Sequence, residues 1–171
     1  MLENNLKKIK LLLLDVDGVL TDGSIIYNDH GEEIKIFNVK DGLGIRLLIE
    51  AGIKVCIITG RKSDALKHRC KNLGIDHVFE GVTDKSSLLE LIFKQTGSTS
   101  DETAFIGDDL MDLSIMNIVG TPIAVADAHD SVIEKALIVT AAKGGQGAVR
   151  EISEAILKAK GLWEKILKRY S

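Results

Sequence analysis

The chain has 171 residues, which fits one compact domain because domains average roughly 150 residues. It carries 22 Lys and Arg against 25 Asp and Glu, so composition predicts neither a nucleic-acid surface nor, at 45% hydrophobic residues, a disordered chain. No apolar run approaches the ~20 residues needed to span a bilayer. The start, MLENNLKKIK, lacks the apolar stretch of a signal peptide, so we expect a cytoplasmic protein with two reduced cysteines and no membrane contact.

Short apolar runs alternate with helical patterns along the chain. Strands are predicted at 10–16, 53–59, 77–79, 103–107, 122–126 and 137–140, and helices at 43–51, 63–73, 86–95, 110–118, 131–135 and 147–160. This repetition predicts an α/β fold with a doubly wound parallel sheet, in a single domain over 1–171 with a flexible glycine-rich C-terminal segment from about 143. Ligands bind such sheets at the carboxyl ends of strands, so the residues after each strand are the candidate site.

The segment 24–38 interrupts the alternation. Two β-type runs, 24–27 and 34–39, flank the turn-forming sequence Asn28-Asp29-His30-Gly31, which predicts an inserted β-hairpin. An isolated hairpin is marginally stable in water, and both faces of this one carry apolar residues. It could pack back on its own domain, but we favour an interface between subunits.

Two aspartates follow the first predicted strand. If the chain stays extended there, Asp15 and Asp17 point the same way, and Asp22 adds a third carboxylate nearby. Like charges in a crevice are unfavourable unless a cation or a shared proton compensates. Asp-Gly pairs also begin turns, but a turn needs only one aspartate, so we favour a chemical role.

Carboxylates also follow the fourth core strand, at Asp108, Asp109 and Asp112. Helix capping would require only one of them. Hard oxygen ligands at neighbouring strand ends predict a site for Mg²⁺. The histidines at 30, 68, 77 and 129 show no paired ligand spacing, so a softer metal is not predicted.

The second core strand ends in Thr59-Gly60-Arg61, where a hydroxyl, free backbone N–H groups and a guanidinium can hold an anion. Thr-Gly-Arg alone is a weak signal, usually only a turn. Lys85 begins a helical pattern, where the helix dipole disfavours a cation. It could be a solvated surface lysine or a functional one, and both interpretations stay open. Together the four strand ends supply the groups needed for phosphoryl transfer through an aspartyl-phosphate.

The ordered set Asp15-Val-Asp17-Gly, Thr59-Gly-Arg61, Lys85 and Gly107-Asp108-Asp109 resembles the haloacid dehalogenase superfamily over nearly the whole chain. The resemblance implies roles for each group: Asp15 as nucleophile, Asp17 as general acid/base, Thr59, Gly60 and Lys85 at the phosphoryl group, Mg²⁺ on the carboxylates of Asp15 and Asp108 and the backbone carbonyl of Asp17, and Asp109 and Asp112 in support. Since related pumps carry threonine at the second position, Asp17 favours a phosphatase or phosphomutase.

Four further segments sharpen the resemblance: 17–23, 37–44, 59–63 and 144–151. They are similar to the 3-deoxy-D-manno-octulosonate (KDO) 8-phosphate phosphatase family of lipopolysaccharide sugar synthesis. That resemblance implies a capless enzyme that forms homotetramers through the hairpin, with a glycine-rich tail that can reach the neighbouring site. Only 41 residues, 18–58, separate the first two motifs, which leaves no room for a lid domain.

An open site cannot exclude water or hold a sugar unaided, so residues from another subunit are expected to help. We predict that Lys40, Asp41, Arg61 and Arg150, together with Asp17, contact a sugar acid phosphate. For Arg150 a surface ion pair with Glu151 or Glu154 is the favoured alternative.

The predicted function is a Mg²⁺-dependent phosphatase for a 2-keto-3-deoxy sugar acid phosphate, a small-molecule substrate. A nonulosonate 9-phosphate phosphatase would share the same motifs, and a phosphomutase would usually carry a lid. A regulatory phospho-acceptor domain is a different class, which Asp17 argues against because it would shorten the life of the acyl phosphate. A non-catalytic oligomeric scaffold is disfavoured by the complete set of motif residues.

Overall fold

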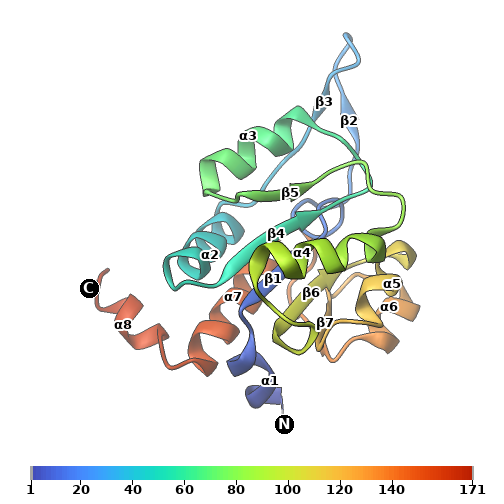
Figure 1. Cartoon of the computed structure of the whole chain (residues 1–171). Coiled ribbons are helices and arrows are strands. Elements are labelled where there is room, and N and C mark those ends of the chain that lie inside the picture. The colour runs from blue at the N-terminus through green and yellow to red at the C-terminus, as the bar shows by residue number, and fades with distance from the viewer. Residues whose placement is uncertain (1, 171) are drawn as a thin grey trace.

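A computed structural model describes residues 2–170. Its centre is a six-stranded parallel sheet with the strand order β5-β4-β1-β6-β7-β8 (Figure 1). The strands are β1 (Leu11–Leu14), β4 (Lys54–Ile58), β5 (His77–Phe79), β6 (Thr103–Gly107), β7 (Thr121–Ala124) and β8 (Ile138–Val139). The predicted doubly wound α/β fold is confirmed.

Helices cover both faces of the sheet. They are α1 (Leu2–Lys8), α2 (Val39–Glu50), α3 (Asp64–Leu73), α4 (Leu89–Thr96), α5 (Leu113–Met116), α6 (Asp130–Lys135), α7 (Ala148–Ala159) and α8 (Trp163–Leu167). Helix α2 contacts α3 and α7. Helix α5 contacts α6, and these two helices follow β6 and β7, beyond the point between β1 and β6 where the strand order reverses. Crossovers between parallel strands are right-handed as a rule, which puts helices on opposite faces where the strand order reverses. No helix within residues 2–170 is long and apolar enough to cross a membrane.

The central strands are buried on both faces, which explains their uninterrupted apolar sequence. All four leucines of β1 are fully buried, as are Ile57, Ile58 and Phe105 in the strands beside it. Cys56 and Cys70 lie in this core as free thiols, as predicted. A rigid core of this kind fixes the positions of the polar residues that follow β1, β4 and β6.

Several predicted helix bounds were wrong. Helix α2 begins at Val39, before the predicted residue 43, because the Asn38 side chain accepts a hydrogen bond from the Lys40 N–H and caps it. The pattern at 86–95 divides into a 3₁₀ turn (Lys85–Leu88) and α4, and the pattern at 110–118 into a 3₁₀ turn (Leu110–Asp112) and α5. Helices α1 and α8 were not predicted.

The predicted hairpin is present, with shorter strands than expected: β2 (Ile26–Tyr27) and β3 (Glu33–Ile34) pair antiparallel and project from the sheet (Figure 1). Its large apolar side chains are exposed: Ile25, Ile26, Tyr27, Ile34 and Ile36. The glycine-rich segment from 143 lies against its own chain, because the Gly145 N–H donates to the Val19 carbonyl before α7 begins.

Candidate active site

The carboxyl ends of β1, β4 and β6 meet at one pocket of about 240 Å³. The residues that line it are Asp15, Asp17, Thr59, Gly60, Arg61, Lys85, Asp108, Asp109, Met111 and Asp112. The sheet therefore brings together the predicted nucleophile, acid/base, phosphate-binding and metal-binding residues. This edge is where the strand order reverses, the usual ligand position in such sheets.

Lys85 lies between two carboxylates in the floor of the pocket. Its Nζ is 2.8 Å from Asp15 Oδ1 and 2.7 Å from Asp112 Oδ1, and its side chain is 3% exposed. Burial opposes the charged form, but the attraction of Asp15 and Asp112 outweighs it and raises the pKa of Lys85. Asp84 holds the turn that presents Lys85, since its side chain accepts from the Ser86 N–H. A surface role for Lys85 is thereby excluded.

Three carboxylates gather at the same point. Ligand atoms of Asp15, Asp108 and Asp112 lie within 4.8 Å of one another. Burial first, then the neighbouring Asp112, raises the pKa of Asp15 to about 6, and burial, then Asp15, raises the pKa of Asp108 to about 8. A cation placed between them would favour their charged forms.

The donor set fits a hard divalent cation. Asp108 Oδ1 is buried and has no hydrogen-bond partner within residues 2–170, as expected for an atom reserved for a ligand. Asp112 is committed elsewhere, because Lys85 engages its Oδ1 and the Asp108 N–H donates to its Oδ2 at 2.8 Å. Asp15 and Asp108 are thus the available carboxylate ligands, and Asp112 supports them.

Asp109 has a local structural role. Its side chain accepts from the Leu110 N–H at 2.7 Å and caps the 3₁₀ turn after β6. Asp112 accepts from the Asp109 N–H in return, which completes a capping box. The interpretation of these carboxylates as caps was therefore correct for Asp109.

Glycines allow the strand ends to approach. A Cβ on Gly18, which has φ +87°, would lie 1.9 Å from Asp108 Oδ2. A Cβ on Gly107 would lie 2.5 Å from Asp112 Oδ2. Side chains at these two positions would push the carboxylate cluster apart, so the glycines are part of how the sequence builds the site.

Thr59 lies buried at the end of β4. Its Oγ1 accepts from the Arg61 N–H at 3.3 Å, and its carbonyl accepts from the Val82 N–H, which ties β4 to the loop before Lys85. Thr59 lines the pocket beside Gly60. This arrangement is compatible with the predicted phosphate-binding role.

Asp17 lies at the mouth of the pocket and is held from the hairpin. Lys35 Nζ donates to Asp17 Oδ1, and Arg61 Nε is 3.7 Å from Asp17 Oδ2. Glu33 contacts both cations, and Tyr27 also contacts Arg61. Sequence reasoning missed these hairpin residues, although alternation in the 33–37 run places Glu33 and Lys35 on one face and the isoleucines on the other.

Three predicted sugar contacts lie outside the pocket in this chain. Lys40 is exposed at the start of α2. The Asp41 carboxylate accepts from the N–H groups of Gly147 and Arg150, at 3.3 and 2.7 Å, so it caps α7. The Arg150 side chain donates to Glu154 at 2.7 Å and lies over the Trp163 ring, which is the ion-pair alternative.

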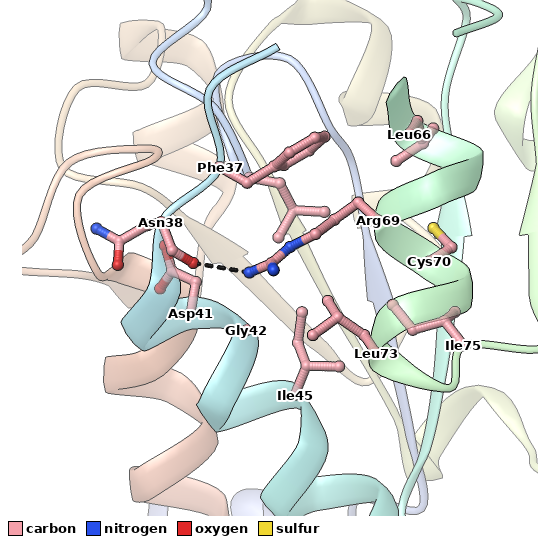
Figure 2. A pocket seen from close by; sticks show the side chains of 11 residues that line it. Phe37, Asn38, Asp41, Gly42, Ile45, Leu66, Arg69, Cys70, Leu73 and Ile75 are labelled. Atoms are coloured by element: carbon pink, nitrogen blue, oxygen red, sulfur yellow. Dashed lines mark hydrogen bonds between the residues drawn. The ribbon is translucent and has the colours of Figure 1, made fainter. Parts of the chain in front are cut away.

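Figure 2 shows the small pocket in which Asp41 lies, between α2 and α3. Arg69 reaches from α3 to the first turn of α2, where its Nη2 donates to the Asn38 carbonyl at 3.0 Å, and its guanidinium lies over the Phe37 ring. A Cβ on Gly42 would clash with that guanidinium. The residues here hold the end of the hairpin and α2 together, and none of them lines the pocket around Asp15.

The comparisons with known proteins agree with this geometry. The sequence model of the haloacid dehalogenase-like hydrolase family matches residues 77–152, which include Lys85, Asp108 and Asp112. The 3-deoxy-D-manno-octulosonate 8-phosphate phosphatase KdsC of Escherichia coli K12 is 45% identical over 155 residues, which cover 91% of this chain and 82% of that protein. The chain belongs to the KDO 8-phosphate phosphatase family.

Solved structures of the KDO 8-phosphate phosphatase family share the fold closely. The Yersinia pestis phosphatase superposes with a TM-score of 0.93 at 45% identity, covering 95% of this chain and 88% of that one. The Moraxella catarrhalis phosphatase, in complex with magnesium ion, phosphate ion and KDO, gives a TM-score of 0.96 at 41% identity, covering 99% and 97% of the two chains. The capless architecture is confirmed, since β1 and β4 are separated only by the hairpin and α2.

Proposed function

We propose that this chain is a Mg²⁺-dependent phosphatase that hydrolyses the phosphomonoester of a 2-keto-3-deoxy sugar acid, with KDO 8-phosphate as its substrate. The observation that carries the proposal is the arrangement of Asp15, Lys85 and Asp108 in one cluster, with Asp17 at its mouth. The family to which the chain belongs supports the substrate class.

The residues divide the chemistry between them. The Asp15 carboxylate attacks phosphorus, and the bond from phosphorus to the sugar oxygen breaks. Asp17 gives its proton to the departing alkoxide and then takes one from the water that hydrolyses the aspartyl-phosphate. Lys85 and Thr59 hold the phosphoryl oxygens, while Lys85 also fixes the position of Asp15.

Mg²⁺ fits the donor set described above and would be held by the Asp15 and Asp108 carboxylates and the Asp17 backbone carbonyl. When bound, it neutralises the phosphoryl oxygens and lowers the repulsion between phosphate and Asp15. Asp112 keeps Asp108 and Lys85 in place during this reaction.

We further propose a cytoplasmic homotetramer assembled through the hairpin. The apolar residues on its outer face are exposed in the single chain, as expected for a surface that another subunit covers. In the tetramer, the sugar acid would contact Lys40 and Arg61 of one subunit and Arg150 of a neighbouring subunit.

The function is tested by phosphate release from a panel of sugar phosphates, with Mg²⁺ or with EDTA. We expect the highest kcat/KM for KDO 8-phosphate, no turnover in EDTA, and none for Asp15→Asn. The matched control is Asp29→Asn, which removes an exposed carboxylate in the hairpin turn. Equal phosphate release by Asp15→Asn and the parent would exclude Asp15 as the nucleophile.

The same panel separates the nearest alternative. A nonulosonate 9-phosphate differs in the length of the sugar chain and would use the same motif residues. A higher kcat/KM for that substrate than for KDO 8-phosphate would reassign the substrate and leave the reaction type unchanged.

A further inference from the structure

Four charged side chains form a closed ring at the mouth of the pocket, in which Asp17 and Glu33 alternate with Lys35 and Arg61. Lys35 Nζ bonds to Asp17 Oδ1 and lies 3.4 Å from Glu33 Oε1. Arg61 Nη2 lies 2.7 Å from the same Glu33 oxygen, and its Nε is 3.7 Å from Asp17 Oδ2. The ring joins the hairpin to the residue placed beside the nucleophile.

The side chain of Lys35 is buried within this ring, at 3% exposed, whereas Ile34 and Ile36 point to the other face of the ribbon and are exposed residues. A buried ammonium group is unfavourable unless it is paired, and both neighbours of Lys35 are carboxylates. The Lys35 ammonium group is therefore buried on the inner face because it pairs with Asp17 and Glu33 at the pocket.

Asp17 depends on Lys35 for its position. Among residues 2–170, Lys35 is the hydrogen-bond donor to the Asp17 side chain, since Arg61 Nε lies beyond hydrogen-bond distance. Glu33 in turn fixes both cations. A general acid must lie within hydrogen-bond reach of the oxygen that it protonates, so a freely rotating Asp17 would be a poor one.

We propose that Lys35 is a positioning residue that orients the Asp17 carboxyl group toward the leaving oxygen, with Glu33 holding Lys35 in place. The inference rests on the proposed phosphatase function. Without Lys35, the Asp17 and Glu33 carboxylates would face each other with only Arg61 between them, and Asp17 would turn away. The contact between Lys85 and Asp15 involves none of the ring and would persist.

Leaving-group dependence distinguishes this role from a structural one. A sugar alkoxide needs a proton to depart, whereas p-nitrophenolate departs without one, and kcat/KM reports the steps up to this departure. We expect Lys35→Met to lower kcat/KM for the sugar phosphate by on the order of tenfold or more and that for p-nitrophenyl phosphate far less. Asp17→Asn serves as the reference, because it shows how kcat/KM for the two substrates changes when the general acid is absent.

Two further variants sharpen the test. Lys35→Arg keeps a cation and should recover part of the activity on the sugar phosphate. Glu33→Gln should show a weaker form of the same discrimination, while Glu90→Gln, a matched control at an exposed position of α4, should show none. Circular dichroism and light scattering establish that each variant is folded and assembled like the parent.

Equal losses on the two substrates would overturn the proposal and leave Lys35 with a structural role. A higher KM confined to substrates that carry a sugar carboxylate, at unchanged kcat, would also overturn it, by making Lys35 a substrate contact. Failure of the proposed function is distinct, because it would appear in the parent as no release of phosphate from any sugar phosphate.

Discussion

The carboxylate cluster and the hairpin are neighbours, but they differ in how much of their side chains a single chain shields from solvent. Asp15, Lys85 and Asp112 are all less than a tenth exposed within a single chain, whereas Ile34 and Ile36 on the outer face of the hairpin are 47% and 67% exposed. A single chain thus buries much of the carboxylate cluster but leaves the apolar residues on the outer face of the hairpin exposed. The charged ring of Asp17, Lys35, Glu33 and Arg61 is where the two regions meet.

The largest effect should come from breaking the cluster itself. Lys85→Met leaves Asp15 and Asp112 facing each other without their shared cation. We expect kcat/KM for the sugar phosphate to fall by on the order of 10³, because a preorganised charge at the phosphoryl group is lost. The control is Lys94→Met, at an exposed position of α4. A loss of less than tenfold by Lys85→Met would contradict its place in the site.

Magnesium affinity should depend on pH in the same cluster. In the metal-free protein the pKa of Asp15 is raised to about 6 and that of Asp108 to about 8, so protons compete with the cation. Both groups lose their protons as the pH rises through these values, so the Kd for Mg²⁺ should fall by on the order of tenfold or more between pH 6 and pH 8.5. Calorimetric titration measures this. A Kd that is constant over the range would contradict the cluster as the metal site.

A charge on the outer face of the hairpin should weaken the assembly of subunits and leave the carboxylate cluster unchanged. Ile36→Asp places a charge on an apolar surface that is 67% exposed in the single chain. We expect the mass measured by light scattering to fall below that of the parent, because a buried unpaired charge is strongly unfavourable at an interface. Ile118→Asp, at another exposed isoleucine, is the control. An unchanged mass for Ile36→Asp would reject the hairpin interface.

The smallest expected effect concerns Asp41, which lies in neither region. Asp41→Ala removes the acceptor for the Gly147 and Arg150 N–H groups at the start of α7. Loss of such a cap costs about 1 kcal/mol, so the Tm should fall by about 2–4 °C. Asp29→Ala is the exposed control. An unchanged Tm with a raised KM would show that Asp41 contacts the substrate instead.

Much of the fold and of the cluster could be predicted because the relevant signals are local. Leu11–Leu14 is apolar throughout because both faces of β1 are covered, and Asp15 follows it directly. Topology then brings separate strand ends together, so Asp15 and Asp108 could be placed in one site before any distance was known.

The remaining parts depend on contacts between distant segments. Lys35 is 18 residues from Asp17, and although alternation places it opposite the isoleucines, no local pattern indicates that its ammonium group meets Asp17. Asp41 caps a helix more than a hundred residues away, which a sequence pattern cannot distinguish from a substrate contact. The start of α2 was missed because Gly42 and Gly44, which favour close packing on Arg69 and α7, weaken its helical pattern.

Acid quenching followed by mass spectrometry detects directly whether Asp15 becomes phosphorylated during turnover. Asp17→Asn supplied with p-nitrophenyl phosphate and Mg²⁺ should form the aspartyl-phosphate and hydrolyse it slowly, because the leaving group needs no proton but the attacking water needs a base. We expect phosphate on the peptide that contains Asp15, and none when Asp15→Asn is added to the same variant. p-Nitrophenol release without phosphate on Asp15, or phosphate on another residue, would exclude Asp15 as the nucleophile.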